Sequence, residues 1–171
     1  MKKYSIKNYL KLADIFTIGN IVFGFLAILF FIKGDFYIGS GCLVFAAVLD
    51  FIDGPIARRT HGATDYGKML DLADLVSFGA APAVFISILV PELIGYIASI
   101  ILLVSSLLRM ARYAVVNTKI KIGMPITVNG LLFPALFLVN EAFAIGYFIF
   151  PLAAIVSSIL MVKTFSLYQR K

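Results

Sequence analysis

Residues 13–31 read ADIFTIGNIVFGFLAILFF, a mostly apolar stretch that is long enough to cross most of a lipid bilayer as a helix. The rest of the chain has the same character. Of its 171 residues, 61% are hydrophobic and only 14% are charged, whereas a soluble domain has about 25% charged residues. A soluble globule of this size has too little interior to bury so many apolar side chains. The composition therefore argues against a soluble enzyme or a disordered chain and indicates that lipid is the solvent.

Six apolar stretches of this kind are separated by short connections, such as Gly34-Asp35, Pro91-Glu92 and Asn140–Phe143. Because backbone groups in lipid must form hydrogen bonds within the chain, each stretch is expected to be a helix. We expect these helices at Ala13–Phe31, Phe36–Ile56, Lys68–Val90, Leu93–Ala114, Ile126–Val139 and Ala144–Phe165. The sequence thus predicts an all-α membrane protein, a six-transmembrane-helix bundle that forms a single domain over residues 1–171.

The basic residues predict how this bundle is oriented. Fourteen of the fifteen Lys and Arg residues fall on one side of the spans, and only Lys33 falls on the other. Cytoplasmic loops carry the excess of positive charge, so both termini of this integral multi-pass cell membrane protein are expected in the cytoplasm. The net charge of +6 is therefore assigned to orientation, and no nucleic acid partner is expected. Residues 1–12 are either an amphipathic lead in the membrane interface or a solvated start.

Acidic residues inside apolar spans are costly and point to function. Asp50 and Asp53 lie three residues apart at the end of the second span, and Asp71 and Asp74 at the start of the third. Each pair shares a helix face, and helices joined by a short loop are antiparallel neighbours, so the four carboxylates are expected to meet. They would repel one another, and their natural partners are hard divalent cations such as Mg²⁺, Ca²⁺ or Mn²⁺, of which four carboxylates can hold two. The other interpretation is a solvated loop whose charges merely flank two spans.

The stretch from Asp50 to Asp71 resembles the signature of the CDP-alcohol phosphotransferase family, D-x2-D-G-x2-A-R-x8-G-x3-D-x3-D. The positions that match at the expected spacing are Asp50, Asp53, Gly54, Ala57, Arg58, Gly67 and Asp71. The last aspartate departs from the signature, because Leu75 stands at its position and the nearest carboxylate is Asp74. A local bulge or a shift of one residue would restore the geometry, so Asp74 is kept in this role.

The resemblance implies a membrane enzyme that transfers a substituted phosphate from a CDP-linked lipid to an alcohol and releases CMP. It implies that the metal is held by Asp50, Asp53, Asp71 and Asp74. It also implies that Asp74 is the catalytic base, which accepts the proton of the alcohol. The implied nucleotide site consists of Asn20, Asp53, Gly54, Ala57, Arg58 and Gly67. Asn20 has a second interpretation, a hydrogen bond between helices.

Polar residues near the fourth and fifth spans are candidates for binding the acceptor. Arg109 and Arg112 lie three residues apart and suit a carboxylate or phosphate, although they also suit contacts with lipid headgroups. Thr127 and Asn129 add hydrogen-bond donors near the start of the fifth span. They are candidates for binding the acceptor, and the alternative is that Thr127 only caps that helix.

Three runs resemble the serine-using branch of the family, the phosphatidylserine and archaetidylserine synthases: Asp74–Pro82, Leu108–Tyr113 and Gly123–Gly130. This resemblance implies CDP-diacylglycerol or CDP-archaeol as donor, L-serine as acceptor and a homodimer. Glycerol phosphate or inositol phosphate is the alternative acceptor. Outside this class, a divalent-cation transporter would use the same aspartates, and a non-catalytic membrane scaffold is a third possibility. The almost purely apolar outer halves of the spans argue against a conduction path.

Overall fold

The computed structural model describes residues 12–59, 72–115 and 123–163, with side chains described over 15–52, 72–112 and 123–163. These residues are helical apart from short connections and contain no β-strand, so the prediction of an all-helical chain is confirmed for them. Two of the helical segments begin with a turn of a different helical type. The segments are α1 (Leu12–Ile32), α2 (Phe36–Arg59), η3 (Leu75–Ala80) with α4 (Ala81–Leu89), α5 (Leu93–Val115), η4 (Ile126–Val128) with α6 (Asn129–Phe143), and α7 (Ile149–Val162).

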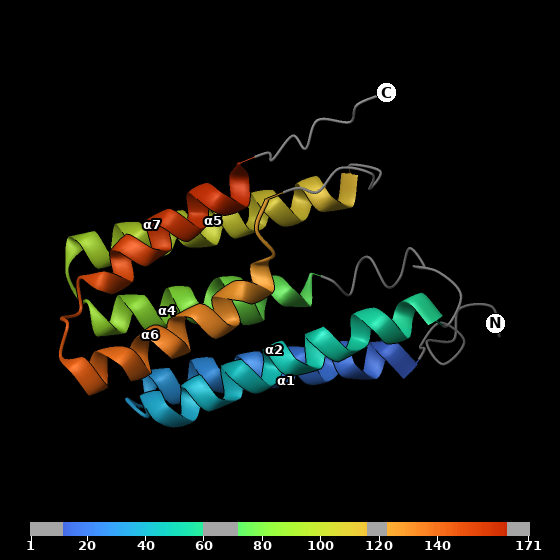
Figure 1. The fold of residues 1–171 in the computed structure, drawn as a ribbon, viewed down its shortest axis with the longest axis horizontal. Helices are drawn as coiled ribbons and strands as arrows, with labels where there is room; N and C mark the ends of the chain where they lie inside the picture. The colour runs from blue at the N-terminus through green and yellow to red at the C-terminus, as the bar shows by residue number, and fades with distance from the viewer. Residues whose placement is uncertain (1–11, 60–71, 116–122, 164–171) are drawn as a thin grey trace.

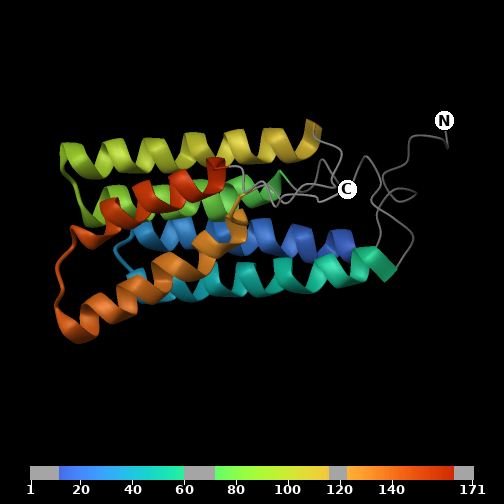
Figure 2. The same cartoon turned by 45° about the horizontal axis from the view of Figure 1, so that its top comes forward.

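The described segments alternate in direction and pack side by side in an elongated bundle (Figures 1 and 2). Helix α1 packs on α2 and α5 packs on α7, while α4 and α6 lie between these two pairs. The start of α1 and the ends of α2, α5 and α7 therefore point to the same end of the bundle, on the right in Figure 1. We call it the carboxylate end, because Asp50 and Asp74 lie toward it.

Three helices are long and apolar enough to cross a membrane, with mean hydropathies of 2.5, 2.0 and 1.5 over Ile15–Ile32, Leu93–Arg112 and Ile126–Phe143. The apolar helices of the other described segments are shorter, at Phe36–Ile52, Leu75–Leu89 and Ile149–Val162. Large apolar side chains also cover the outside of the bundle, and Leu93 and Phe143 are 74% and 76% exposed. Such a surface suits lipid and not water, so the chain is a helical membrane protein.

Aromatic side chains form the core of the bundle at the end opposite the carboxylate end. The ring of Phe85 in α4 lies 4.8 Å from that of Phe31, 5.9 Å from that of Phe137 and 5.5 Å from that of Phe150, centroid to centroid. All four residues are buried. Tilted and edge-to-face ring pairs attract each other beyond the area that they bury. Phe85 therefore joins α4 to α1, α6 and α7.

The connection between α6 and α7 differs from the prediction. Residues Asn140–Phe143 form the last turn of α6 rather than a connection, and α7 begins at Ile149 rather than at Ala144. Ala144 ends α6 in the left-handed conformation with φ 49°, and Gly146 follows with φ 108°. Oδ1 of Asn140 accepts a hydrogen bond from the N–H of Gly146 at 2.8 Å and stabilises this turn. Hydropathy misses the turn because its residues are apolar.

Other predicted boundaries agree more closely with the structure. Helix α1 covers Ala13–Phe31, α5 begins at Leu93 as predicted, and α4 ends one residue before the predicted end at Val90. Helix α2 continues to Arg59, three residues beyond the predicted end. The predicted start of the third span, the end of the sixth, and residues 1–11 of the amphipathic lead lie outside the described residues.

Gly39 and Gly41 lie in the same helix, but only Gly39 faces a neighbouring helix. A Cβ atom at position 39 would lie 2.5 Å from the ring of Phe31, whereas one at position 41 would have nothing within 4 Å. We predict that Gly39→Ala lowers the free energy of unfolding by about 1–3 kcal/mol through overpacking. The matched control Gly41→Ala should raise it by up to about 1 kcal/mol, because alanine favours helix. Thermal unfolding in detergent measures both, and equal midpoints would contradict the close contact between α1 and α2.

Candidate functional site

Two aspartates from different segments face each other toward the carboxylate end of the bundle. Asp50 comes from α2, and Asp74 directly precedes η3. Their carboxyl groups lie within hydrogen-bonding distance, and the guanidinium of Arg109 in α5 lies near enough to Asp50 for a favourable charge interaction. Two carboxylates at such a distance repel each other unless a proton or a cation lies between them.

Each of these carboxyl groups also receives a hydrogen bond from an uncharged donor. Nδ2 of Asn20 in α1 donates to Oδ1 of Asp74 at 2.6 Å, and Oγ1 of Thr127 in η4 donates to Oδ2 of Asp50 at 2.5 Å. Both hydrogen bonds are short, and in each the carboxyl oxygen is the acceptor. The two donors hold the aspartates in fixed orientations.

Close packing of α1 against η3 makes the contact between Asn20 and Asp74 possible. The hydroxyl of Ser77, which is fully buried, donates to the backbone carbonyl of Asn20 at 3.1 Å. A Cβ atom at Gly24, one helical turn further along α1, would lie 2.1 Å from Oγ of Ser77. Only glycine at position 24 leaves room for η3 to pack this closely on α1. This packing brings Asp74, which directly precedes η3, within reach of Asn20.

The turn that follows Asp74 is π-helical. The N–H of Ala81 bonds to the carbonyl of Val76, five residues earlier, instead of four as in an α-helix. The sequence suggested a bulge that would compensate for the short spacing between Asp71 and Asp74. The structure has such a distortion, but it begins after Asp74, so it changes the direction of Asp74 relative to α4. Asp71 lies outside the described residues, and its relation to Asp74 stays a prediction.

The two candidate arginines make different contacts. Arg109 is near enough to Asp50 for a favourable charge interaction, whereas Nη1 of Arg112 donates to the backbone carbonyl of Val162 at 3.0 Å. That carbonyl belongs to the last residue of α7, so Arg112 caps this helix. Asn129 is fully buried: its Nδ2 donates to the carbonyl of Phe78 at 3.2 Å.

Sequence reasoning gave Asn20 two interpretations, a nucleotide ligand or a hydrogen bond between helices, and the contact with Asp74 agrees with the second. It gave Thr127 as an acceptor ligand or a helix cap, and missed its contact with Asp50. In the structure both donate to the predicted metal ligands, as residues do that orient such ligands. The signal available in the sequence was that Asn20 and Thr127 are polar residues within apolar stretches. The sequence does not show which group each one binds, because that depends on how the helices pack.

The described part of the site supplies some of the oxygen atoms that a hard divalent cation requires. Asp50 and Asp74 are adjacent, and Oδ1 of the buried Asn20 has no hydrogen-bond partner among the described residues. Carboxylate and amide oxygens suit Mg²⁺. Within the described residues, no group of three or more His, Cys, Asp or Glu side chains is placed to hold a metal ion. Asp71 lies outside them, as does the side chain of Asp53.

The remaining predicted nucleotide residues lie where the structure gives no side-chain detail. Gly54, Ala57 and Arg58 continue helix α2 beyond Asp50, and nothing is described of their side chains. Gly67 lies outside the described residues. Their roles stay predictions from the family signature.

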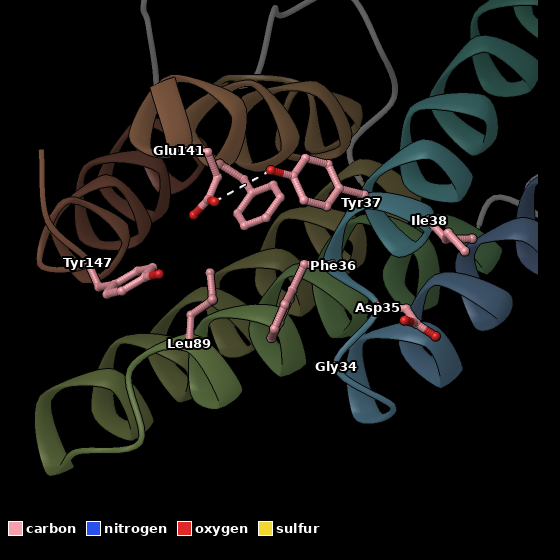
Figure 3. A pocket seen from close by; sticks show the side chains of 9 residues that line it. Gly34, Asp35, Phe36, Tyr37, Ile38, Leu89, Glu141 and Tyr147 are labelled. Carbon is pink, nitrogen blue, oxygen red and sulfur yellow. Dashed lines mark hydrogen bonds between the residues drawn. The ribbon is translucent and has the colours of Figure 1, made fainter. Parts of the chain in front are cut away.

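A cavity of about 310 Å³ lies at the opposite end of the bundle (Figure 3). Near it, the hydroxyl of Tyr37 donates to Oε2 of Glu141 at 3.4 Å, which links α2 to α6. Figure 3 shows the side chains of Glu141 and Tyr147 beside those of Leu89 and Phe36. None of the predicted site residues lines this cavity, so it is separate from the carboxyl pair. The residues that line it are Gly34, Asp35, Phe36, Tyr37, Ile38, Leu89, Phe137, Glu141 and Tyr147.

A family model and several named relatives match this sequence, and they agree with one another. A model of the CDP-alcohol phosphatidyltransferase family matches residues 10–167. A CDP-diacylglycerol–serine O-phosphatidyltransferase of Methanocaldococcus jannaschii is 35% identical over 131 residues, which are 75% of this chain and 61% of that protein. A protein of the same name from Bacillus subtilis is 31% identical over 67% of this chain and 68% of its own length.

An archaetidylserine synthase of Methanothermobacter thermautotrophicus is also similar, with 29% identity over 148 residues. The match covers 81% of this chain and 62% of that protein. This chain therefore spans about three fifths of the length of the two archaeal relatives that it matches.

The hydrogen bond from Thr127 to Asp50 can be tested directly. Thr127→Val keeps the shape of the side chain but removes the donor, so we predict a loss of about 1–3 kcal/mol in the free energy of unfolding. Thr127→Ser keeps the hydroxyl and should lose clearly less. Thermal unfolding in detergent measures both variants. A valine variant as stable as wild type would contradict this contact.

Proposed function

Because the chain belongs to the CDP-alcohol phosphatidyltransferase family, we propose that it transfers a phosphatidyl or archaetidyl group from a CDP-linked lipid to the hydroxyl of L-serine. The products are CMP and phosphatidylserine or archaetidylserine. One observation carries the proposal: Asp50 and Asp74 lie side by side, each held by an uncharged donor, in a chain of this family. The names of the three relatives support serine as the acceptor.

We assign a divalent metal, two ions of Mg²⁺ or Mn²⁺, to Asp50, Asp53, Asp71 and Asp74. When bound, the metal supplies positive charge that offsets the charge of the donor's pyrophosphate. The adjacent carboxyl groups of Asp50 and Asp74 support this assignment, as does Oδ1 of Asn20, which has no partner in the described part of the chain, because these are oxygen atoms of the type that such ions bind. By the family signature, the nucleotide site consists of Asn20, Asp53, Gly54, Ala57, Arg58 and Gly67.

The proposed reaction replaces one P–O bond with another. The serine hydroxyl oxygen bonds to the phosphorus that carries the lipid. The bond from this phosphorus to the bridging oxygen breaks, and CMP leaves with that oxygen. Asp74 accepts the proton that the hydroxyl loses, since a hydroxyl is a weak nucleophile without a base. The amide of Asn20 holds the Asp74 carboxyl in position for this step.

The acceptor site is assigned to the surroundings of the carboxyl pair. Arg109, beside Asp50, carries the positive charge that the serine carboxylate requires. Thr127 lies on the same pair. Arg112 and Asn129 form hydrogen bonds with residues of α7.

We further propose that all six helical segments cross the membrane, with both termini and the active site on the cytoplasmic side. The alternating directions of the described segments support an even number of spans. Among the described residues, Arg109 and Arg112 belong to α5 and Lys163 directly follows α7, and both of these helices end at the carboxylate end. The family resemblance is the basis for proposing a homodimer.

The acceptor is tested by measuring CMP release from purified protein with CDP-diacylglycerol or CDP-archaeol. We predict release with L-serine, and little release with glycerol phosphate or inositol phosphate, since these acceptors need a more basic pocket. Release with a phosphorylated polyol and not with serine would overturn the serine assignment. Uptake of divalent metal into liposomes without CMP release would favour a transporter instead.

The roles of the two aspartates are tested by Asp50→Asn and Asp74→Asn. We predict that Asp50→Asn abolishes CMP release at ordinary Mg²⁺ or Mn²⁺ concentrations, because it removes a charged metal ligand. Asp74→Asn should stop turnover while CDP-lipid binding is partly retained. The matched control Asp35→Asn changes an exposed aspartate at the opposite end and should keep full activity. Normal turnover by Asp50→Asn would contradict the metal site.

A further inference from the structure

The direction of Asp74 depends on a helical turn that tertiary contacts must stabilise. Asp74 directly precedes η3, in which the N–H of Ala81 bonds to the carbonyl of Val76. Turns of this kind are rare and occur mostly at functional sites. Each residue of an α-helix turns the chain by about 100°. Because a π-helical turn contains about one extra residue, a return of η3 to an α-helix would rotate Asp74 away from Asp50.

One carbonyl of η3 lacks its ordinary partner. Pro82 lies four residues after Phe78, and proline has no N–H. The carbonyl of Phe78 therefore cannot accept the usual α-helical hydrogen bond. Phe78 is fully buried, so water does not reach this group. Nδ2 of Asn129, the first residue of α6, donates to the carbonyl at 3.2 Å.

The other end of the same amide is bound as well. Oδ1 of Asn129 accepts a hydrogen bond from Oγ of Ser157 in α7 at 2.6 Å. Asn129 and Ser157 are both buried. The ring of Phe78 also lies so close to Gly130 that a Cβ there would be 2.6 Å from it. The Asn129 amide therefore lies between η3 and α7 with its orientation determined at both ends.

The segment that contains Asn129 contacts both carboxyl-bearing elements. Thr127 bonds Asp50 directly, and Asn129, two residues later, bonds the turn that follows Asp74. We propose that Asn129 is a positioning residue, whose amide holds η3 in its π-helical register and so fixes the Asp74 carboxyl relative to Asp50. This inference rests on the proposed function, in which both carboxylates take part.

A matched pair of variants tests the proposal. Asn129 and Asn140 are buried asparagines of the same helix, and each accepts a hydrogen bond through Oδ1. We expect Asn129→Leu to lower kcat for CMP release at least tenfold, and to raise the Mn²⁺ concentration that gives half-maximal rate. Asn140→Leu should lose a similar amount of thermal stability and keep kcat within twofold of wild type. A kcat for Asn129→Leu within twofold of that for Asn140→Leu would overturn the proposal.

A second variant tests whether Asn129 positions Asp74 or only provides a hydrogen bond to the carbonyl of Phe78. Pro82→Ala supplies the missing N–H to Phe78. In the Asn129→Leu background it should raise the unfolding temperature but leave kcat low, because an α-helical register does not restore the direction of Asp74. Recovery of kcat in this double variant would show that Asn129 only satisfies the carbonyl, and would overturn the proposal. Ser157→Ala leaves the bond to Phe78 in place and should have a smaller effect on kcat than Asn129→Leu.

Binding of Mn²⁺ distinguishes failure of this inference from failure of the proposed function. If wild-type protein releases no CMP with serine, the proposed function fails. Electron paramagnetic resonance then measures how tightly the detergent-purified variants bind Mn²⁺, and this measurement does not require turnover. At least fivefold weaker binding to Asn129→Leu than to Asn140→Leu would support positioning. Equal binding would contradict it.

Discussion

Two half-buried carboxyl groups that lie close together toward one end of an apolar helical bundle constrain the rest of this structure. Buried charge is costly unless it is paired and hydrogen-bonded. Around Asp50 and Asp74, the compensating groups come from three further segments: Asn20 from α1, Arg109 from α5 and Thr127 from η4. Since these residues are far apart in the sequence, the pair is compensated only when most of the bundle is assembled.

The two ends of the bundle have different kinds of core. Opposite the carboxyl pair, rings packed around Phe85 join four helices through shape and dispersion. Toward the pair, small residues such as Gly24 and Ser77 let helices approach closely and exchange hydrogen bonds. The core of the apolar end is built mainly from ring contacts, which contribute stability. The polar end provides the orientation that chemistry requires.

Hydropathy and charge predicted much of this arrangement, because both are local properties of the sequence. They located the helices to within a few residues in most cases, and the antiparallel pairing of neighbouring spans correctly placed Asp50 near Asp74. The turn after Ala144 was missed, since its residues are as apolar as those of a helix. A bulge near Asp74 was inferred, but the position of the π-helical turn after Asp74 and the partner of Asn129 were missed. They depend on contacts between residues about fifty positions apart, such as Asn129 and Phe78, which no local pattern encodes.

The contacts of Asn129 also bear on the order in which the protein matures. Its partners lie 51 residues before it and 28 residues after it in the chain. When Asp74 has been synthesised and inserted, the groups that hold the following turn are still missing. The turn gains its last support only after α7 docks and Ser157 meets the amide. Before α7 docks, a partly inserted chain therefore contains both carboxylates, but the support of the turn that follows Asp74 is incomplete.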